Sequence, residues 1–114
     1  MRVIVCGGRS YSDRDTLFKA LDWIHLKEPI TTIVHGGCSG ADNLAAQWAK
    51  EIGVRLEEHK ANWKLYGPAA GPIRNREMAE TFPNLVLAFP GGRGTEDMIR
   101  VAQNKGIETR RIEA

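Results

Sequence analysis

The chain has 114 residues, which is enough for one domain with a real core and too few for a second. Apolar residues make up 42% of the sequence and charged residues 26%, as in ordinary soluble globular proteins, and we expect a cytoplasmic protein without a signal peptide or a transmembrane span. The formal net charge of +2 is too small to favour duplex DNA or a membrane surface as the main partner.

The chain opens with a short apolar run that predicts a buried strand, Val3–Cys6. Ser12 or Asp13 then caps a helix, whose apolar residues recur at helical spacing. A second strand, Thr31–Val34, follows this helix and leads into a glycine-rich turn. This alternation of strand and helix begins a parallel sheet.

The next helix runs from Ala41 to Ile52, with Gly53 well placed as its C-cap. Val54–Glu57 is a third strand, and its polar character places it near an edge of the sheet. A loop rather than a helix is predicted for residues 59–71, which contain Gly67, Pro68 and Gly71.

Pro72 begins the third predicted helix, at the first helical position that proline favours, and this helix continues to about Phe82. Leu85–Phe89 is then a strand buried on both faces, ended by Pro90, which has no amide hydrogen. A fourth helix follows at once and ends near Gly106.

Residues Glu108–Ile112 form a short polar last strand. Strands that alternate with helices over short loops predict an α/β fold with a Rossmann-like three-layer αβα sandwich. Its five-stranded sheet is mostly parallel, with strand order 3-2-1-4-5, and residues 1–114 form a single domain.

Three glycine-rich turns, Gly7–Arg9, Gly36–Gly40 and Gly91–Gly94, follow the first, second and fourth strands. Ligands of such sheets bind at the carboxyl ends of the strands where the strand order reverses, here between strands one and four. Glycines there let the backbone approach an anion, and a helix start adds a positive dipole end. Tight turns without a ligand are the alternative, but the convergence of three turns favours a phosphate site.

Two side chains on these turns have more than one interpretation. Arg9, beside Ser10, either grips a phosphate or forms a salt bridge to a neighbouring loop. Asp42 either neutralises the dipole of its helix or accepts hydrogen bonds from a ribose, and we favour the structural role. His35 and Cys38 are too few for a metal centre, so we expect no metal and no cofactor.

The third predicted helix carries Arg74, Asn75 and Arg76 in its first turn, where positive charge opposes the helix dipole. An anionic ligand would remove this penalty, whereas pairing of Arg74 with Glu77 would be purely structural. Trp63 and Tyr66 in the preceding loop either stack on a base or anchor the loop in the core.

Two well-known nucleotide motifs are missing from this sequence. The first turn is not a G-x-G-x-x-G fingerprint, which disfavours a dinucleotide bound as in dehydrogenases. No G-x-x-x-x-G-K-[ST] element occurs, which excludes a P-loop kinase or ATPase at the level of sequence.

Three motifs follow one another along the chain: His35-Gly36-Gly37-x-x-Gly40-Ala41-Asp42, Ala70-Gly71-Pro72-x-Arg74-Asn75-x-x-Met78 and Phe89-Pro90-Gly91-Gly92-x-Gly94-Thr95. On these motifs the chain resembles the SLOG superfamily, in particular its YspA/YpsA-related branch of bacteria and their phages. Relatives include the LOG phosphoribohydrolases, formerly called lysine decarboxylase-like, and the DNA-uptake protein DprA. The resemblance implies a Rossmann-like nucleotide-binding domain that forms a homodimer or higher homo-oligomer in some relatives.

The LOG enzymes cleave the N-glycosidic bond of nucleoside 5'-monophosphates with an arginine and a glutamate. Arg74 matches the arginine, but Met98 stands where the motif that begins at Pro90 would have the glutamate. Methionine cannot carry charge or accept a proton, and we expect it in the core. A hydrolase would therefore need Asp97, Glu96 or Glu77 to supply the carboxylate.

We therefore expect a binder of a nucleoside phosphate or an ADP-ribose-like molecule. A phosphoribohydrolase that uses Arg74, Glu77 and Asp97 is the alternative, and single-strand nucleic-acid binding of the DprA type is a weaker one that the low net charge disfavours. The predicted ligand-binding residues, which lie on the three turns and the third helix, are Gly7, Gly8, Arg9, Ser10, Gly36, Gly37, Ser39, Gly40, Asp42, Arg74, Asn75, Pro90, Gly91, Gly92, Arg93, Gly94 and Thr95.

Overall fold

A computed structural model describes residues 1–113. Its five strands are all parallel and follow the order β3-β2-β1-β4-β5, so the predicted sheet is confirmed. The outer strands β3 and β5 form the two edges. Every strand boundary lies within one residue of the prediction: β1 Arg2–Cys6, β2 Thr32–His35, β3 Arg55–Glu58, β4 Leu85–Ala88 and β5 Glu108–Arg111.

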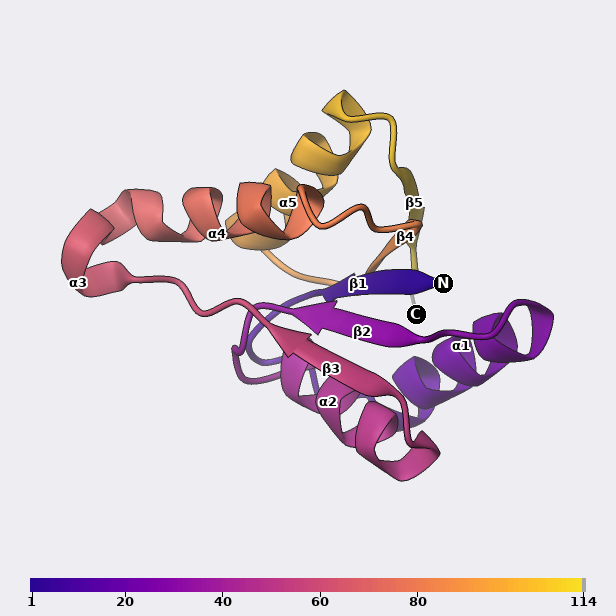
Figure 1. Ribbon diagram of the computed structural model, residues 1–114. Coiled ribbons are helices and arrows are strands. Elements are labelled where there is room, and N and C mark those ends of the chain that lie inside the picture. Colours follow the sequence, from indigo (N-terminus) through magenta and orange to yellow (C-terminus); the bar gives the residue numbers. More distant parts are fainter. Residues whose placement is uncertain (114) are drawn as a thin grey trace.

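Helices cover both faces of the sheet, which gives the predicted three layers (Figure 1). α1 and α2 pack on one face, and α4 and α5 lie on the other. The helices are α1 Arg14–Lys27, α2 Ala41–Ile52, α3 Trp63–Tyr66, α4 Ala70–Ala79 and α5 Arg93–Asn104, with a 3₁₀ turn, η1, at Gly67–Ala69.

The central strand β1 divides the core into two clusters. Its residues Val3 and Val5 pack with α1 and α2, whereas Ile4 and Cys6 pack with α4 and α5. Successive side chains of a strand point to opposite faces, so a run of four apolar residues is what a doubly covered strand requires. Met98 of α5 is fully buried in the second cluster, as the sequence predicts.

Helix caps follow the local sequence. Asp13 is the N-cap of α1, and its Oδ1 accepts a hydrogen bond from the Thr16 amide at 3.1 Å. Gly53 ends α2 in the left-handed conformation with φ of 88°, and its amide donates to the Ala49 carbonyl at 2.8 Å. These two boundaries were predictable because each depends on one residue type.

The predicted loop at residues 59–71 is wrong in part, because it contains α3 and η1 and because α4 begins at Ala70 instead of Pro72. Asn62 caps α3 by accepting a hydrogen bond from the Leu65 amide at 3.1 Å. Proline is tolerated anywhere in a first helical turn, since those amides have no intrahelical acceptor. α4 ends at Ala79 and does not reach Phe82, whose φ of 60° is incompatible with a right-handed helix.

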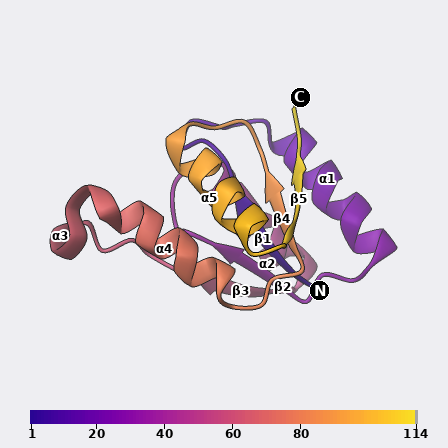
Figure 2. The ribbon, with the colours of Figure 1, turned by 90° about the horizontal axis from the view of Figure 1, so that it is seen from above.

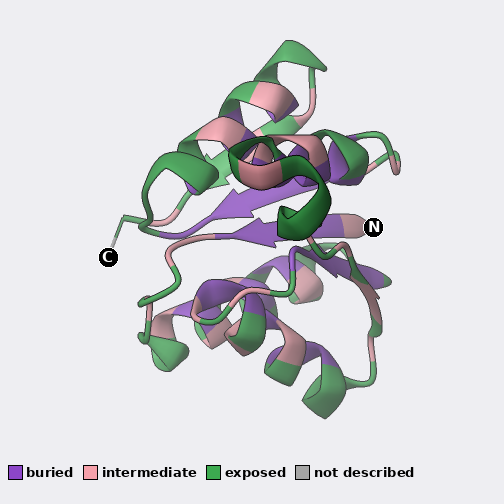
Figure 3. Cartoon of the chain, turned by 90° about the vertical axis from the view of Figure 1, so that its left-hand side faces the viewer, coloured by how far each residue is buried: buried purple, intermediate pink, exposed green. Residues whose placement is uncertain are grey.

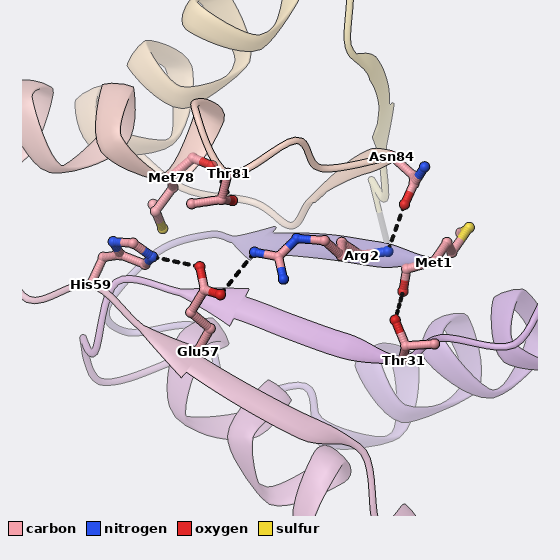
Figure 4. A network of polar contacts seen from close by, with 8 residues as sticks. All are labelled: Met1, Arg2, Thr31, Glu57, His59, Met78, Thr81 and Asn84. Carbon is pink, nitrogen blue, oxygen red and sulfur yellow. Dashed lines mark hydrogen bonds and ion pairs between the residues drawn. The ribbon is translucent and has the colours of Figure 1, made fainter.

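A hydrogen-bonded network of polar side chains covers part of the sheet face beside α4. Glu57 on β3 accepts a hydrogen bond from Nη2 of Arg2 at 2.9 Å and lies 2.7 Å from Nε2 of His59 (Figure 4). These hydrogen bonds, His59 first, lower the pKa of the Glu57 carboxyl. This polar network thus extends from β1 to the edge strand β3 on the side of the sheet that faces α4 (Figure 4).

Candidate functional site

A cleft of about 1560 Å³ opens at the carboxyl ends of the parallel strands. The turns after β1, β2 and β4 line it, together with α3, the start of α4 and the first turn of α5. In Figure 2, which looks from above, α3 and the first turns of α4 project beyond the sheet on one side of this end. The cleft therefore lies where the strand order reverses, at the place that the sequence predicts.

Most predicted site residues meet in this cleft, but four do not line it. Glu77 is exposed on α4, and Gly37, Ser39 and Gly40 belong to the turn after β2 but are not among the lining residues. The Ser39 hydroxyl donates instead to the Arg9 carbonyl at 3.1 Å. The predicted residues that line the cleft are Gly7, Gly8, Arg9, Ser10, Gly36, Asp42, Arg74, Asn75, Pro90, Gly91, Gly92, Arg93, Gly94, Thr95 and Asp97.

The glycine turns are locked to one another through their backbones. The Gly8 amide donates to the Pro90 carbonyl at 2.8 Å, and the Gly8 carbonyl accepts from the Ala41 amide at 3.3 Å. A Cβ at Gly40 would lie 2.1 Å from the Gly8 carbonyl oxygen, and one at Gly91 would lie 2.7 Å from the Gly8 nitrogen. Gly40 and Gly91 are thus required for contact between the turns.

Gly92 and Gly94 differ, because a Cβ at either position would have no neighbour within 4 Å. The first amides of a helix have no intrahelical acceptor. Gly92 is the N-cap of α5 and has no side chain that could accept a hydrogen bond from them. These amides and the positive end of the helix dipole meet at the cleft, since Arg93, Gly94 and Thr95 all line it. The start of α5 is therefore suited to an anion.

Arg74 is a buried cation in the cleft wall, only 9% exposed. Its Nη1 donates to the Gly36 carbonyl at 3.0 Å, and its Nε donates to Oδ1 of Asn75 at 3.1 Å. No carboxylate within residues 1–113 forms an ion pair with it, Glu77 included. Because α4 begins at Ala70, Arg74 is in its second turn, so burial and not the helix dipole makes its charge costly.

Asn75 connects Arg74 to the start of α5. Its amide nitrogen donates to Oδ2 of Asp97 at 2.9 Å and to the Gly94 carbonyl at 3.2 Å. Asp97 also forms an ion pair with Arg100, and only 11% of the Asp97 side chain is exposed. Each end of the Asn75 amide therefore has a fixed partner, and this residue holds the side chains of Arg74 and Asp97 in place.

Asp42 has a structural role, which the sequence favours. Its Oδ2 accepts hydrogen bonds from the amides of Gly36 at 3.0 Å and Cys38 at 3.2 Å, which shapes the turn after β2. Burial raises the pKa of this carboxyl, and the two amide hydrogen bonds oppose that shift.

Other titratable groups near the cleft are poor candidates for chemistry. Burial raises the pKa of the Cys6 thiol to about 12, which keeps it protonated and unreactive. Burial also lowers the pKa of His35, whose Nδ1 accepts from the Gly37 amide at 3.0 Å. Residues 1–113 contain no cluster of three or more His, Cys, Asp or Glu side chains able to hold a metal ion.

The aromatic residues before α4 are not core anchors, which corrects one of the two interpretations of Trp63 and Tyr66. Their exposed fractions are 48% and 46%, and the segment is coloured mainly as exposed in Figure 3. Trp63 lines the cleft, with its ring centroid 5.8 Å from Cζ of Arg9.

Several lining residues were not predicted from the sequence, among them Tyr11, Cys38 and Arg100. Tyr11 packs against Phe89 with ring centroids 5.3 Å apart and ring planes tilted by 41°. Its position directly after Gly7–Ser10 is the one feature of the sequence that points to the cleft. Arg100 lies one helical turn beyond Asp97, and that spacing alone does not reveal that a side chain reaches the cleft.

The sheet order and the cleft at its reversal point define a Rossmann-like α/β protein with a ligand site built on the turns after its strands. Residues 1–66 match the model of the YspA, cpYpsA-related SLOG family, and the chain belongs to this family. Family membership indicates a nucleotide-related function in the broad sense.

A relative from a phage is similar along nearly its whole length. The chain is 40% identical over 114 residues to the Gene 61 protein of Mycobacterium phage D29, with 93% of this chain and 91% of the relative covered. The name of that relative describes no activity. No helix in residues 1–113 is both long enough and apolar enough to cross a membrane.

Proposed function

We propose that the cleft binds a nucleoside phosphate or an ADP-ribose-like molecule, with phosphate at the start of α5 and Arg74 as its charge partner. The observation that carries this proposal is the Arg74 guanidinium, which is buried in the cleft wall without a carboxylate partner in residues 1–113. A buried cation without a counter-charge is destabilising, and an anionic ligand would supply that charge.

The other charges of the cleft support the same ligand. Arg9 and Arg93 line the cleft and are exposed, and neither forms an ion pair within residues 1–113. The acidic residues at the start of α5 are already paired: Glu96 with Arg111 at 2.8 Å, and Asp97 with Arg100. The cations without partners thus face a cleft whose carboxylates are mostly neutralised, which favours an anion.

Replacement of Arg74 by alanine tests the proposal. We expect Arg74→Ala to weaken binding of a phosphate ligand about 10- to 150-fold, the range for a lost charge-assisted hydrogen bond. Calorimetry with AMP, ADP and ADP-ribose measures the effect. Arg76→Ala is the matched control, because Arg76 is exposed on the same helix and does not line the cleft. Equal affinities of the two variants would overturn the role of Arg74.

We further propose that binding occurs without hydrolysis of the N-glycosidic bond. Met98 is fully buried in the core, and the two candidate carboxylates that line the cleft already have partners. Asp97 is held by Asn75 and Arg100, and Glu96 is paired with Arg111. Both oxygens of the Asp97 carboxylate are engaged by protein groups, so this side chain is not positioned to act on a substrate. Loss of a catalytic acid or base slows such reactions by about 10²- to 10⁴-fold.

AMP incubated with the protein is therefore expected to release no adenine above background, as measured by chromatography. A parallel incubation with Arg74→Ala sets that background, because this variant lacks the proposed phosphate contact. Rapid release by the unmodified protein that is lost in both Arg74→Ala and Asp97→Asn would identify a hydrolase with Asp97 as its carboxylate.

A further inference from the structure

We propose that Trp63 and Arg9 form a stacking subsite for the base of the bound nucleotide, an inference that rests on the proposed function. It narrows the ligand from phosphate compounds in general to those that carry a planar aromatic base. The observation behind it is the meeting of an exposed indole ring and an exposed guanidinium, from separate segments, at one cleft.

Trp63 reaches the cleft from the short helix α3, which projects beyond the carboxyl ends of the strands (Figure 1). Nearly half of this large apolar side chain, 48%, remains in contact with solvent. Burying an aromatic ring is favourable, so an indole left exposed at the wall of a ligand cleft offers surface for a ligand to cover.

Gly71 brings the ring of Trp63 close to the proposed charge partner of the phosphate. A Cβ built at Gly71 would lie 3.3 Å from Cη2 of Trp63 and 4.0 Å from Nη2 of Arg74. The indole ring and the free edge of the guanidinium therefore flank the same glycine. A ligand with an anionic group and an aromatic ring would contact both of them.

Arg9 reaches the ring of Trp63 from the turn after β1. Its Cζ lies 5.8 Å from the ring centroid, a separation at the outer limit of a cation–π contact. A base between the two groups would need about 7 Å, which is twice the 3.4 Å stacking distance of nucleic-acid bases. Arg9 is exposed, so its long side chain can move outward by about 1 Å to admit the base.

A second tryptophan is also exposed beside a cation, but it lies away from the cleft and is therefore not part of the proposed subsite. Trp23 on α1 is 58% exposed and has Nζ of Lys27 4.9 Å from its ring centroid, but it does not line the cleft. Trp23 is therefore a matched control for Trp63, since it has the same side chain, similar exposure and a similar cationic neighbour.

The experiment compares ligands with and without a base. Calorimetry measures the affinities of AMP, GMP, CMP, UMP and ribose 5-phosphate for the unmodified protein and for the Trp63→Ala, Trp63→Phe and Trp23→Ala variants. We expect Trp63→Ala to weaken binding of the best nucleotide about 5- to 150-fold and to leave ribose 5-phosphate within about twofold, because only the base stacks. Trp63→Phe should retain most of the affinity, and Trp23→Ala should change neither ligand.

Two results would overturn the subsite. The first is unchanged nucleotide affinity in Trp63→Ala, and the second is an equal loss for the nucleotide and for ribose 5-phosphate. In either case Arg74→Ala would still weaken both ligands if the proposed function is correct. If none of these ligands binds the unmodified protein, and ADP and ADP-ribose do not bind it either, the proposed function and the subsite both fail.

Discussion

Replacement of Gly92 by valine is expected to weaken binding of a nucleotide by at least about 100-fold, which corresponds to about 2.7 kcal/mol, while the protein stays folded. A Cβ at Gly92 would meet nothing within 4 Å, so the fold has room for the side chain. Gly92 is also the N-cap of α5 and lines the cleft. The valine methyl groups would therefore occupy the space in which a phosphate would approach the free amides of the helix.

Calorimetry with the nucleotide that binds the unmodified protein best measures this effect. Thermal denaturation of the ligand-free variant checks that its fold is retained. Unchanged affinity in a folded Gly92→Val protein would show that the phosphate does not rest at the start of α5, whatever the role of Arg74.

A different glycine is expected to have its largest effect on stability. Gly40→Ala should lower the free energy of unfolding by about 3 kcal/mol or more, as backbone strain and overpacking do when they coincide. Its Cβ would lie 2.1 Å from the Gly8 carbonyl oxygen and 2.6 Å from the Arg9 carbonyl oxygen, both of which belong to backbone. Gly40 also has a φ of 78°, which disfavours any side chain.

The Gly53→Ala variant separates the cost of backbone strain from the cost of overpacking in the loss of stability expected for Gly40→Ala. Gly53 has a φ of 88°, but a Cβ there would meet nothing within 4 Å, so only the cost of the conformation applies, about 1–2 kcal/mol. Unfolding in urea, followed by circular dichroism, gives both values. If Gly40→Ala proves no more destabilising than Gly53→Ala, the turns are not tightly interlocked.

Most of the fold could be predicted because the central strands are buried on both faces. Val3–Cys6 and Leu85–Ala88 appear in the sequence as continuous apolar runs, and short connections then restrict the order of the strands. α3 could not be predicted in this way, because its four residues are too few for a periodic pattern. The cap at Asn62 was the one local indication of it.

The position of the cleft could be predicted from the sequence. Which of its glycines contact another turn, and which face the cleft, could not. Gly40, Gly91 and Gly92 are the same residue in similar turns, and only their neighbours in space distinguish a glycine that packs against another turn from one that faces the cleft. For Arg74 the sequence indicated a residue that does line the cleft, but by an argument from the helix dipole that the true start of α4 removes. Its burial depends on the contact with Gly36, which is distant in the sequence.

The polar character of the two outer strands affects how the protein behaves at high concentration. An outer strand with unsatisfied backbone groups is a template on which another chain can add a strand and begin to aggregate, and charged side chains oppose this. Both outer strands are only four residues long, and β5 carries an internal ion pair, Arg110 with Glu108 at 2.6 Å. The charged residues on them are Arg55, Glu57, Glu58, Glu108, Arg110 and Arg111. Concentrated solutions should therefore resist the growth of intermolecular β-structure.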